Sequence, residues 1–127
     1  MSELKKEGFN ITATGILTSQ QIVLAAEAGA AYMAPYVNRA DNIGGDGVKL
    51  VEEAYKILSR NKDNEAKILG ASYKNVRQVH NSILAGAEAV TVPADILKQR
   101  IHHPYTGWSI EKFERDWAKG YGEGKTL

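Results

Sequence analysis

Tyr36 and Arg39 are the two side chains of this sequence whose types and spacing most clearly indicate a site. A phenol donates or accepts a proton, and a guanidinium presents a fork of N–H donors. The pair follows a short apolar run, residues 30–33, and precedes a glycine-rich loop, residues 44–47. This pattern predicts a strand that ends in the tyrosine and the arginine and delivers both to the mouth of a site.

The composition indicates a single domain, residues 1–127. The chain has 127 residues, 43% of them hydrophobic, and a net charge of +1 from 16 basic and 15 acidic residues. Because the charges are interspersed, we expect no nucleic-acid partner. The absence of cysteine excludes disulfides and thiol chemistry. No apolar run approaches the roughly 20 residues of a membrane span, and residues 1–6 are charged, unlike a signal peptide. We therefore expect a cytoplasmic protein without a membrane partner.

Four strand–helix units are predicted, followed by a terminal helix. β-branched or continuously apolar runs predict the strands, and N-cap residues at Thr18, Asp46 and Asn75 predict where three helices begin. The expected strands are residues 10–14, 31–34, 66–71 and 89–92. The expected helices are residues 20–28, 47–60, 75–85, 93–100 and about 106–118. In the last helix, Trp108, Phe113 and Trp117 form a predicted packing stripe.

The units repeat with a period of about 28 residues, because Gly29 and Gly86 lead into equivalent strands 57 positions apart. Such a period is typical of a (β/α) barrel or a doubly wound sheet. A closed barrel needs eight units and about 250 residues. We therefore predict an α/β fold that is half of a TIM (β/α)8 barrel, completed by self-association. A flavodoxin-like arrangement, with helices on both faces, is the alternative.

The stretch 34–39 resembles a signature of the transaldolase family, specifically of its small fructose-6-phosphate aldolase type. Six blocks in order are similar to the carboxyl-terminal half of that family. These blocks are residues 8–14, 21–32, 35–47, 71–78, 85–93 and 110–117. The blocks cover most of the chain, so the resemblance is specific.

The resemblance implies a class I aldolase of sugar-phosphate metabolism. Family members make or cleave a carbon–carbon bond between a dihydroxyacetone unit and an aldehyde, through a lysine Schiff base and without a metal or other cofactor. By position, Tyr36 matches the tyrosine of the acid–base step, and Thr14 matches a threonine on a strand that faces the site. Arg39 and Ser72 match the residues that hold the substrate phosphate. These types suit the roles, since a phenol near a water relays a proton and a guanidinium binds phosphate through two hydrogen bonds.

The Schiff-base lysine of the family has no counterpart here. In the family it lies on the fourth barrel strand, and this sequence matches from the fifth strand onward. No lysine of the chain lies within an apolar strand run that would lower its pKa, as an amine nucleophile needs. We therefore expect a truncated aldolase, inactive alone, that needs a complementing amino-terminal half or forms a homo-oligomer. The alternative is a non-catalytic, sugar-phosphate-binding or self-assembling half-barrel.

Each candidate residue also has a simpler interpretation. On this interpretation Tyr36 packs at the end of the strand, and Arg39 pairs with Asp41. Ser72 is then a helix N-cap, and Thr14 is an ordinary strand residue that faces the site. The adjacent pair His102-His103 has no third ligand nearby, so no metal site is expected.

Overall fold

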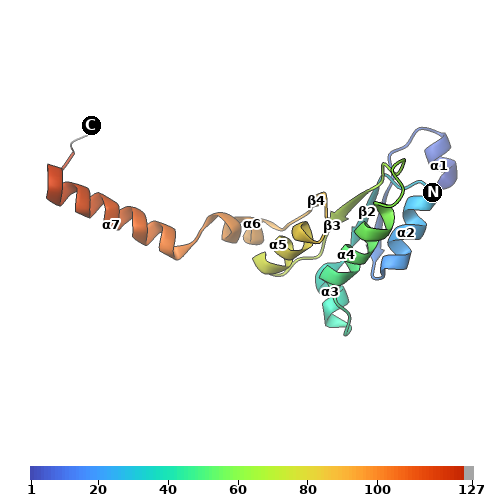
Figure 1. Ribbon diagram of the computed structural model, residues 1–127, viewed down its shortest axis with the longest axis horizontal. Helices are drawn as coiled ribbons and strands as arrows, with labels where there is room; N and C mark the ends of the chain where they lie inside the picture. The colour runs from blue at the N-terminus through green and yellow to red at the C-terminus, as the bar shows by residue number, and fades with distance from the viewer. Residues whose placement is uncertain (125–127) are drawn as a thin grey trace.

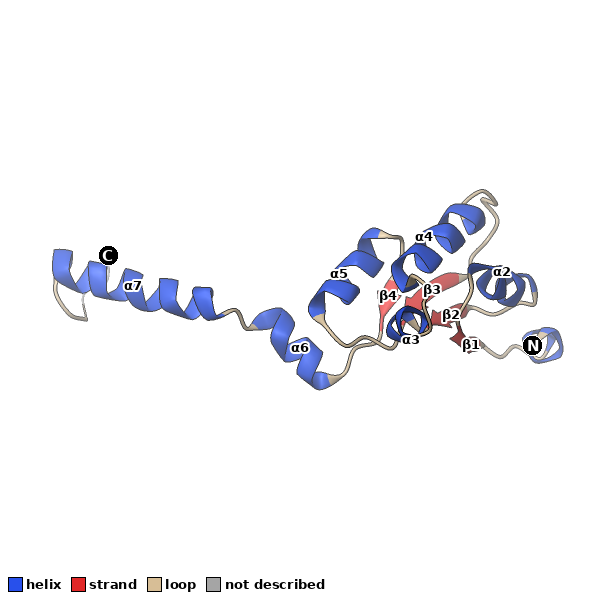
Figure 2. Ribbon diagram, turned by 90° about the horizontal axis from the view of Figure 1, so that it is seen from below, coloured by secondary structure: helices blue, strands red, loops and turns tan. Residues whose placement is uncertain are grey.

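A four-stranded parallel sheet forms the body of the molecule, and helices cover one of its faces (Figures 1 and 2). The computed structural model describes residues 1–124. The strands are β1 (Thr12–Ile16), β2 (Tyr32–Pro35), β3 (Lys67–Gly70) and β4 (Ala89–Val90). The helices are α1 (Ser2–Lys6), α2 (Ser19–Glu27), α3 (Val37–Asn42), α4 (Gly47–Leu58), α5 (Val76–Leu84), α6 (Ala94–Ile101) and α7 (Pro104–Tyr121).

The strands lie in the sheet in the order in which they occur in the sequence, β1-β2-β3-β4. A doubly wound sheet reverses its strand order at a switch point and places helices on both faces. Here the order does not reverse, and α2, α4 and α5 lie on the same side of the sheet (Figure 2). The flavodoxin-like alternative is therefore wrong, and the predicted parallel α/β architecture is confirmed.

The hydrophobic core lies between the sheet and these helices. Met33 and Ile68 point from the strands toward it, and Ile22, Val51 and Val79 meet them from α2, α4 and α5, all at 0–1% exposure. Each such burial contributes about 1.5–3 kcal/mol. On the opposite face Thr12, Thr14, Tyr32 and Lys67 are exposed. The sheet therefore has one covered and one uncovered face within residues 1–124.

The three predicted N-caps are confirmed. Thr18 forms a capping box with Gln21 at the start of α2. Asp46 accepts a hydrogen bond from the amide of Lys49, and Asn75 accepts one from the amide of Gln78. Each cap satisfies an amide that the helix itself leaves without a partner.

The boundaries of several elements differ from the prediction. The first strand begins at Thr12 rather than at residue 10, because the carbonyl of Ile11 accepts both the Ala31 and the Tyr32 amides, and the ladder starts after it. The fourth strand is only two residues long. Helix α4 ends at Leu58, before the predicted residue 60.

The prediction that a strand carries both Tyr36 and Arg39 is wrong. Strand β2 ends at Pro35, Tyr36 is the N-cap of α3, and Arg39 lies within that helix. The chain turns here because the amides of Val37 and Asn38 donate, each at 2.9 Å, to the carbonyls of residues 71 and 72 beyond β3. A contact between distant segments thus sets the start of α3.

Helices α6 and α7 extend away from the sheet (Figure 1). The terminal helix is longer than predicted, Pro104–Tyr121, and buries none of its residues. Trp108 and Phe113 are 52% and 69% exposed, so these two residues of the predicted stripe are not buried against another element of the described chain. Trp117 stacks on Tyr121 at 4.4 Å between ring centroids.

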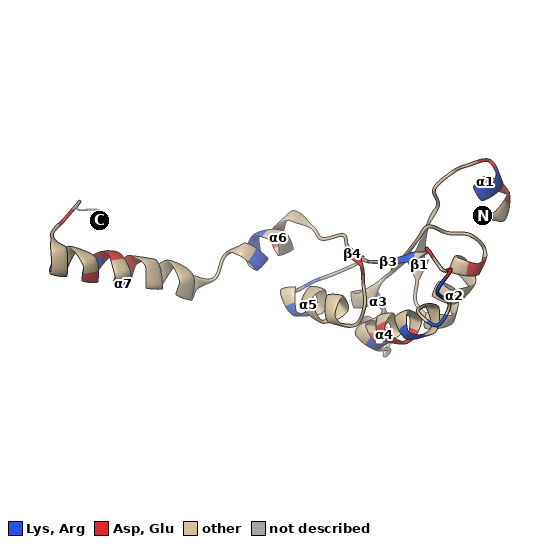
Figure 3. Ribbon diagram, turned by 45° about the horizontal axis from the view of Figure 1, so that its top comes forward, with Lys and Arg blue, Asp and Glu red and all other residues tan. Residues whose placement is uncertain are grey.

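Acidic and basic residues are interspersed on the helices, as α4 illustrates (Figure 3). Glu52 and Lys56 pair there one turn apart. Within residues 1–124, no helix has the length and apolar character needed to cross a membrane.

Candidate functional site

Thr14, within β1, and Tyr36, directly after β2, meet at the carboxyl-terminal side of the sheet. The Thr14 hydroxyl donates a hydrogen bond to the Tyr36 hydroxyl at 3.2 Å. Since Thr14 pairs with Ala34 in the parallel ladder, the sheet register itself places the two residues together. The structure thus joins two of the four predicted site residues by a direct contact. Because the Tyr36 oxygen accepts from Thr14, its own O–H remains able to point toward a ligand.

Arg39 joins the same cluster from the first turn of α3. Its guanidinium carbon lies 4.5 Å from the centroid of the Tyr36 ring. A guanidinium over an aromatic face is attracted by the ring quadrupole, which restricts the side chain while leaving its N–H groups free to bind. The simpler interpretation, an ion pair with Asp41, is not observed among the described residues. Asp41 instead accepts from the amide of Gly47 at 2.7 Å and from the side chain of Gln78 at 2.8 Å.

Ser72 lies directly after the point where Tyr36 and Ala71 form an isolated parallel bridge. Its carbonyl accepts the amide of Asn38 at 2.9 Å, so the backbone connects Ser72 to the Arg39 helix. Ser72 has a φ of 62°, which places it in the left-handed region that residues with a Cβ seldom occupy. Such strain of about 1–3 kcal/mol persists where surrounding structure imposes it, often at functional sites. Ser72 is not a helix N-cap, because Asn75 has that role.

Tyr73, the residue after Ser72, packs into the hydrophobic core and holds the Ser72 turn in place. Its side chain is 2% exposed, and a Cβ on Gly70 would lie 1.9 Å from its hydroxyl oxygen. Burial raises the pKa of Tyr73 above its usual value of 10.0, and the nearby Ser82 hydroxyl offsets only part of that rise. The two buried hydroxyls adjoin without the geometry of a hydrogen bond. The ring is thus fixed by packing, and Gly70 is required to make room for it.

The lysines of residues 1–124 are all exposed. Lys67 is the first residue of β3. It therefore lies at the amino end of the strand, five positions before Ser72. Lys125 lies outside the described residues. None of the described lysines is therefore buried beside Tyr36, as a desolvated amine nucleophile would be.

The two adjacent histidines lie at helix ends. His102 is the C-cap of α6, and Nδ1 of His103 accepts the amide of Tyr105 at 3.2 Å at the start of α7. In the described part of the chain, no group of three or more histidine, cysteine, aspartate or glutamate residues is arranged to hold a metal ion.

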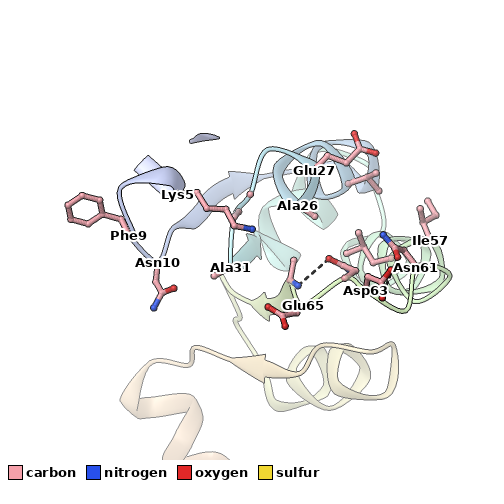
Figure 4. Close-up of a pocket in the computed structure, with 17 residues that line it drawn as sticks. Lys5, Phe9, Asn10, Ala26, Glu27, Ala31, Ile57, Asn61, Asp63 and Glu65 are labelled. Carbon is pink, nitrogen blue, oxygen red and sulfur yellow. Dashed lines mark hydrogen bonds between the residues drawn. The ribbon is translucent and has the colours of Figure 1, made fainter. Parts of the chain in front are cut away.

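A pocket of about 590 Å³ opens at the other end of the sheet (Figure 4). It is lined by α1, the carboxyl ends of α2 and α4, and the loop before β3, with Lys5, Glu27 and Asp63 among its polar residues. Of the predicted residues, Tyr36, Arg39 and Ser72 follow the opposite, carboxyl ends of β2 and β3, and Thr14 lies within β1 beside Tyr36. Sites of (β/α) folds form at those carboxyl ends, so the cluster around Tyr36 is the stronger candidate.

Comparison with known proteins decides the family. The Transaldolase/Fructose-6-phosphate aldolase family model matches residues 1–123. The chain belongs to this family. The transaldolase resemblance inferred from the motif blocks is thereby confirmed.

The fold is similar to that of TIM-barrel-like enzymes of known structure. A flavocytochrome b2 variant with bound pyruvate shares 20% identity at a TM-score of 0.58, covering 72% of this chain and 25% of that chain. A lactate oxidase (described as putative) from Pediococcus acidilactici shares 18% identity at a TM-score of 0.52, covering 66% and 23%. At these identities the likeness shows the fold alone. The transaldolase-family chain spans about a quarter of the length of each.

Three polar residues of the site region were not predicted to contact one another. Asn38, Asp41 and Gln78 form a hydrogen-bonded group between α3 and α5. Asp41 and Gln78 lie 37 positions apart, so no local spacing indicated their contact. The only sequence signal was their presence in the motif blocks around Tyr36 and Ser72.

Proposed function

We propose that this chain is the phosphate-holding half of a class I, transaldolase-type aldolase of sugar-phosphate metabolism. In this proposal Arg39 and Ser72 bind the phosphate of the sugar, and Tyr36 relays a proton during cleavage or transfer of a dihydroxyacetone unit. The observation that carries it is the cluster of Thr14, Tyr36 and Arg39 at the carboxyl-terminal side of the sheet. Family membership supplies the reaction class.

The proton step suits the geometry of Tyr36. In aldol cleavage, the hydroxyl next to the breaking carbon–carbon bond loses its proton while the bonding electrons move toward the Schiff base. Thr14 donates to the Tyr36 oxygen, and the Arg39 guanidinium lies over the ring, so the phenol is held by two partners. A phenol fixed in this way passes a proton to or from a neighbouring water.

The proposal assigns the Schiff-base lysine to polypeptide outside residues 1–127. The uncovered face of the sheet and its sequential strand order support completion of a (β/α)8 barrel by a second set of four units. A complementing amino-terminal half that carries the lysine would add the nucleophile, and we place the assembled enzyme in the cytoplasm. The chain alone is then inactive.

Two measurements test this function. Inorganic phosphate titrated into the wild-type chain should bind saturably, and Arg39→Ala should weaken binding at least tenfold, since a charge-assisted pair is lost. Borohydride added with dihydroxyacetone should trap no adduct on this chain alone. A trapped lysine within residues 1–127 would overturn the assignment of the nucleophile to another segment. Unchanged phosphate affinity in Arg39→Ala would overturn the assignment of the phosphate site.

The second candidate is a non-catalytic half-barrel that pairs with a copy of itself. The exposed Thr12, Thr14 and Tyr32 on the uncovered sheet face favour it, because a parallel sheet is ordinarily covered on both faces. Molecular mass in solution separates the candidates. A homodimer that binds phosphate but gains no activity with a lysine-bearing half supports the second, whereas restored aldol activity supports the first.

A further inference from the structure

Gln78 occupies the junction between the three segments that carry the proposed phosphate site. Its Oε1 accepts the amide of Lys74 at 2.9 Å, in the turn that follows Ser72. Its Nε2 donates to Oδ2 of Asp41 at 2.8 Å and to Oδ1 of Asn38 at 3.2 Å, both on α3. The side chain therefore connects the Ser72 turn to the helix that carries Arg39.

The orientation of this amide group is fixed by its partners. A backbone N–H faces one end of the Gln78 amide, which must be the oxygen, and a carboxylate faces the other, which must be the NH2 group. Both N–H donors of Gln78 are thus used on α3. A glutamate or an apolar residue of the same length cannot reproduce this pattern.

Asp41 extends the connection to α4. Its second oxygen accepts the amide of Gly47, the first residue of that helix, at 2.7 Å. A Cβ on Gly47 would lie 2.3 Å from the carbonyl oxygen of Val37, so α3 and α4 are in backbone contact at this point. With the Asn38 amide bound to the Ser72 carbonyl, α3 is restrained against two neighbouring segments.

We infer that Gln78 is a positioning residue that, through Asp41 and Asn38, sets the placement of Arg39 relative to Ser72 and thereby the affinity of the site for a phosphate group. The inference rests on the proposed function, since it takes Arg39 and Ser72 as the phosphate ligands. Gln78 acts through its partners and does not itself touch the anion. Arg39 lies between Asn38 and Asp41 in the sequence of α3, so a shift of that helix moves the guanidinium with it.

A reciprocal exchange of donor and acceptor tests the inference. Gln78→Glu places a second carboxylate against Asp41, and Asp41→Asn presents an NH2 group to the NH2 of Gln78. Each single variant should weaken the binding of inorganic phosphate about tenfold, the cost of one charge-assisted hydrogen bond. In the double variant the new Asn donates to the new Glu, which still accepts from the Lys74 amide and accepts from Asn38 when the Asn38 side-chain amide turns over. Its affinity should return to within about threefold of wild type.

The measurements are phosphate titration and thermal unfolding of the full 127-residue chain, with Gln20→Glu, an exposed site on α2, as the matched charge control. Affinity is measured at a temperature where circular dichroism shows each variant folded. If Gln78→Glu does not fold, Gln78→Met replaces it as the single variant, with the same expected loss.

Two results overturn the inference separately from the proposed function. If the single variants lower the unfolding temperature and leave the phosphate affinity unchanged, Gln78 only stabilises the fold and does not position the site. A double variant no better than the singles shows that the exchange of hydrogen bonds is not what matters. A wild-type chain that binds no phosphate instead overturns the proposed site, and the inference with it.

Discussion

Helices α3 and α7 differ in what fixes them. Helix α3 has six residues, too few to be stable in isolation, whereas α7 has eighteen. Yet α3 buries Val37 and Ala40, and its first amides bind carbonyls beyond β3. Helix α7 buries no residue. Placement of Arg39 therefore depends on contacts with neighbouring segments and not on the helix-forming tendency of its own sequence.

The largest effect should come from separating α3 from α4. In Gly47→Ala, the new Cβ would lie 2.3 Å from the Val37 carbonyl oxygen and 2.6 Å from the Val37 Cα, both backbone atoms with little room to move. We expect a loss of about 3 kcal/mol in the free energy of unfolding, at the upper end of overpacking effects. Urea denaturation measures it. A loss below about 1 kcal/mol would show that the contact with α4 contributes little to holding α3 in place.

A smaller effect should come from the strain in the turn that borders α3. Ser72→Gly removes the cost of the φ of 62°, so we expect a gain of about 1 kcal/mol in stability. Ser72→Ala keeps the Cβ and the strain, and it isolates the loss of the hydroxyl. Both variants should bind phosphate more weakly than wild type. Equal unfolding free energies in the two variants would contradict the assignment of strain to this residue.

Alkaline pH should destabilise the body of the protein through Tyr73. The folded pKa of Tyr73 is raised above 10.0 because burial disfavours the phenolate. As the pH rises through 10, the unfolded chain loses this proton first, so the contribution of Tyr73 to stability is present below pH 10 and falls above it. Unfolding free energy measured between pH 8 and 11 should therefore fall less in Tyr73→Phe than in wild type.

The matched control for that experiment lies on α7. Tyr105 is 70% exposed, so Tyr105→Phe should show the wild-type dependence on pH. Identical curves for wild type and Tyr73→Phe would contradict the role of the buried phenol.

The smallest effect should come from the interior of α7. Nothing lies within 4 Å of a Cβ added at Gly107, so Gly107→Ala changes only helix propensity. We expect about 0.5–1 kcal/mol of added helix stability, seen as slower amide exchange within α7. The unfolding midpoint of the sheet should not change. A shift in that midpoint would show that α7 is coupled to the body after all.

The sequence predicted the features that depend on neighbours within a few positions. Asp46 and Asn75 each cap a helix through an amide three residues ahead, and such spacing is visible in the sequence. Helix α3 was missed because Tyr36 provides no side-chain cap, and its start depends on the carbonyls of Ala71 and Ser72, 34 positions away from the amides that they accept.

The site could be predicted only in part, because some of its features depend on contacts between distant segments. Family motifs identified Thr14, Tyr36 and Arg39, and the structure brings these three together. The positive φ of Ser72 and the contact between Asp41 and Gln78 left no local pattern to detect. Both arise from how β3 and α5 pack against α3, which only the folded chain determines.

The sequential order of the strands also bears on how this protein folds while it is being synthesised. Thr12 pairs with Tyr32, Tyr32 with Lys67, and Leu69 with Ala89, so within residues 1–124 no ladder joins residues more than 35 positions apart. Each ladder closes a loop of at most 35 residues, so its entropy cost of loop closure is smaller than that of a pairing between the two ends of the chain. The first two strands and α2 are able to dock while the rest of the chain is still being synthesised, with each later strand adding to a finished edge.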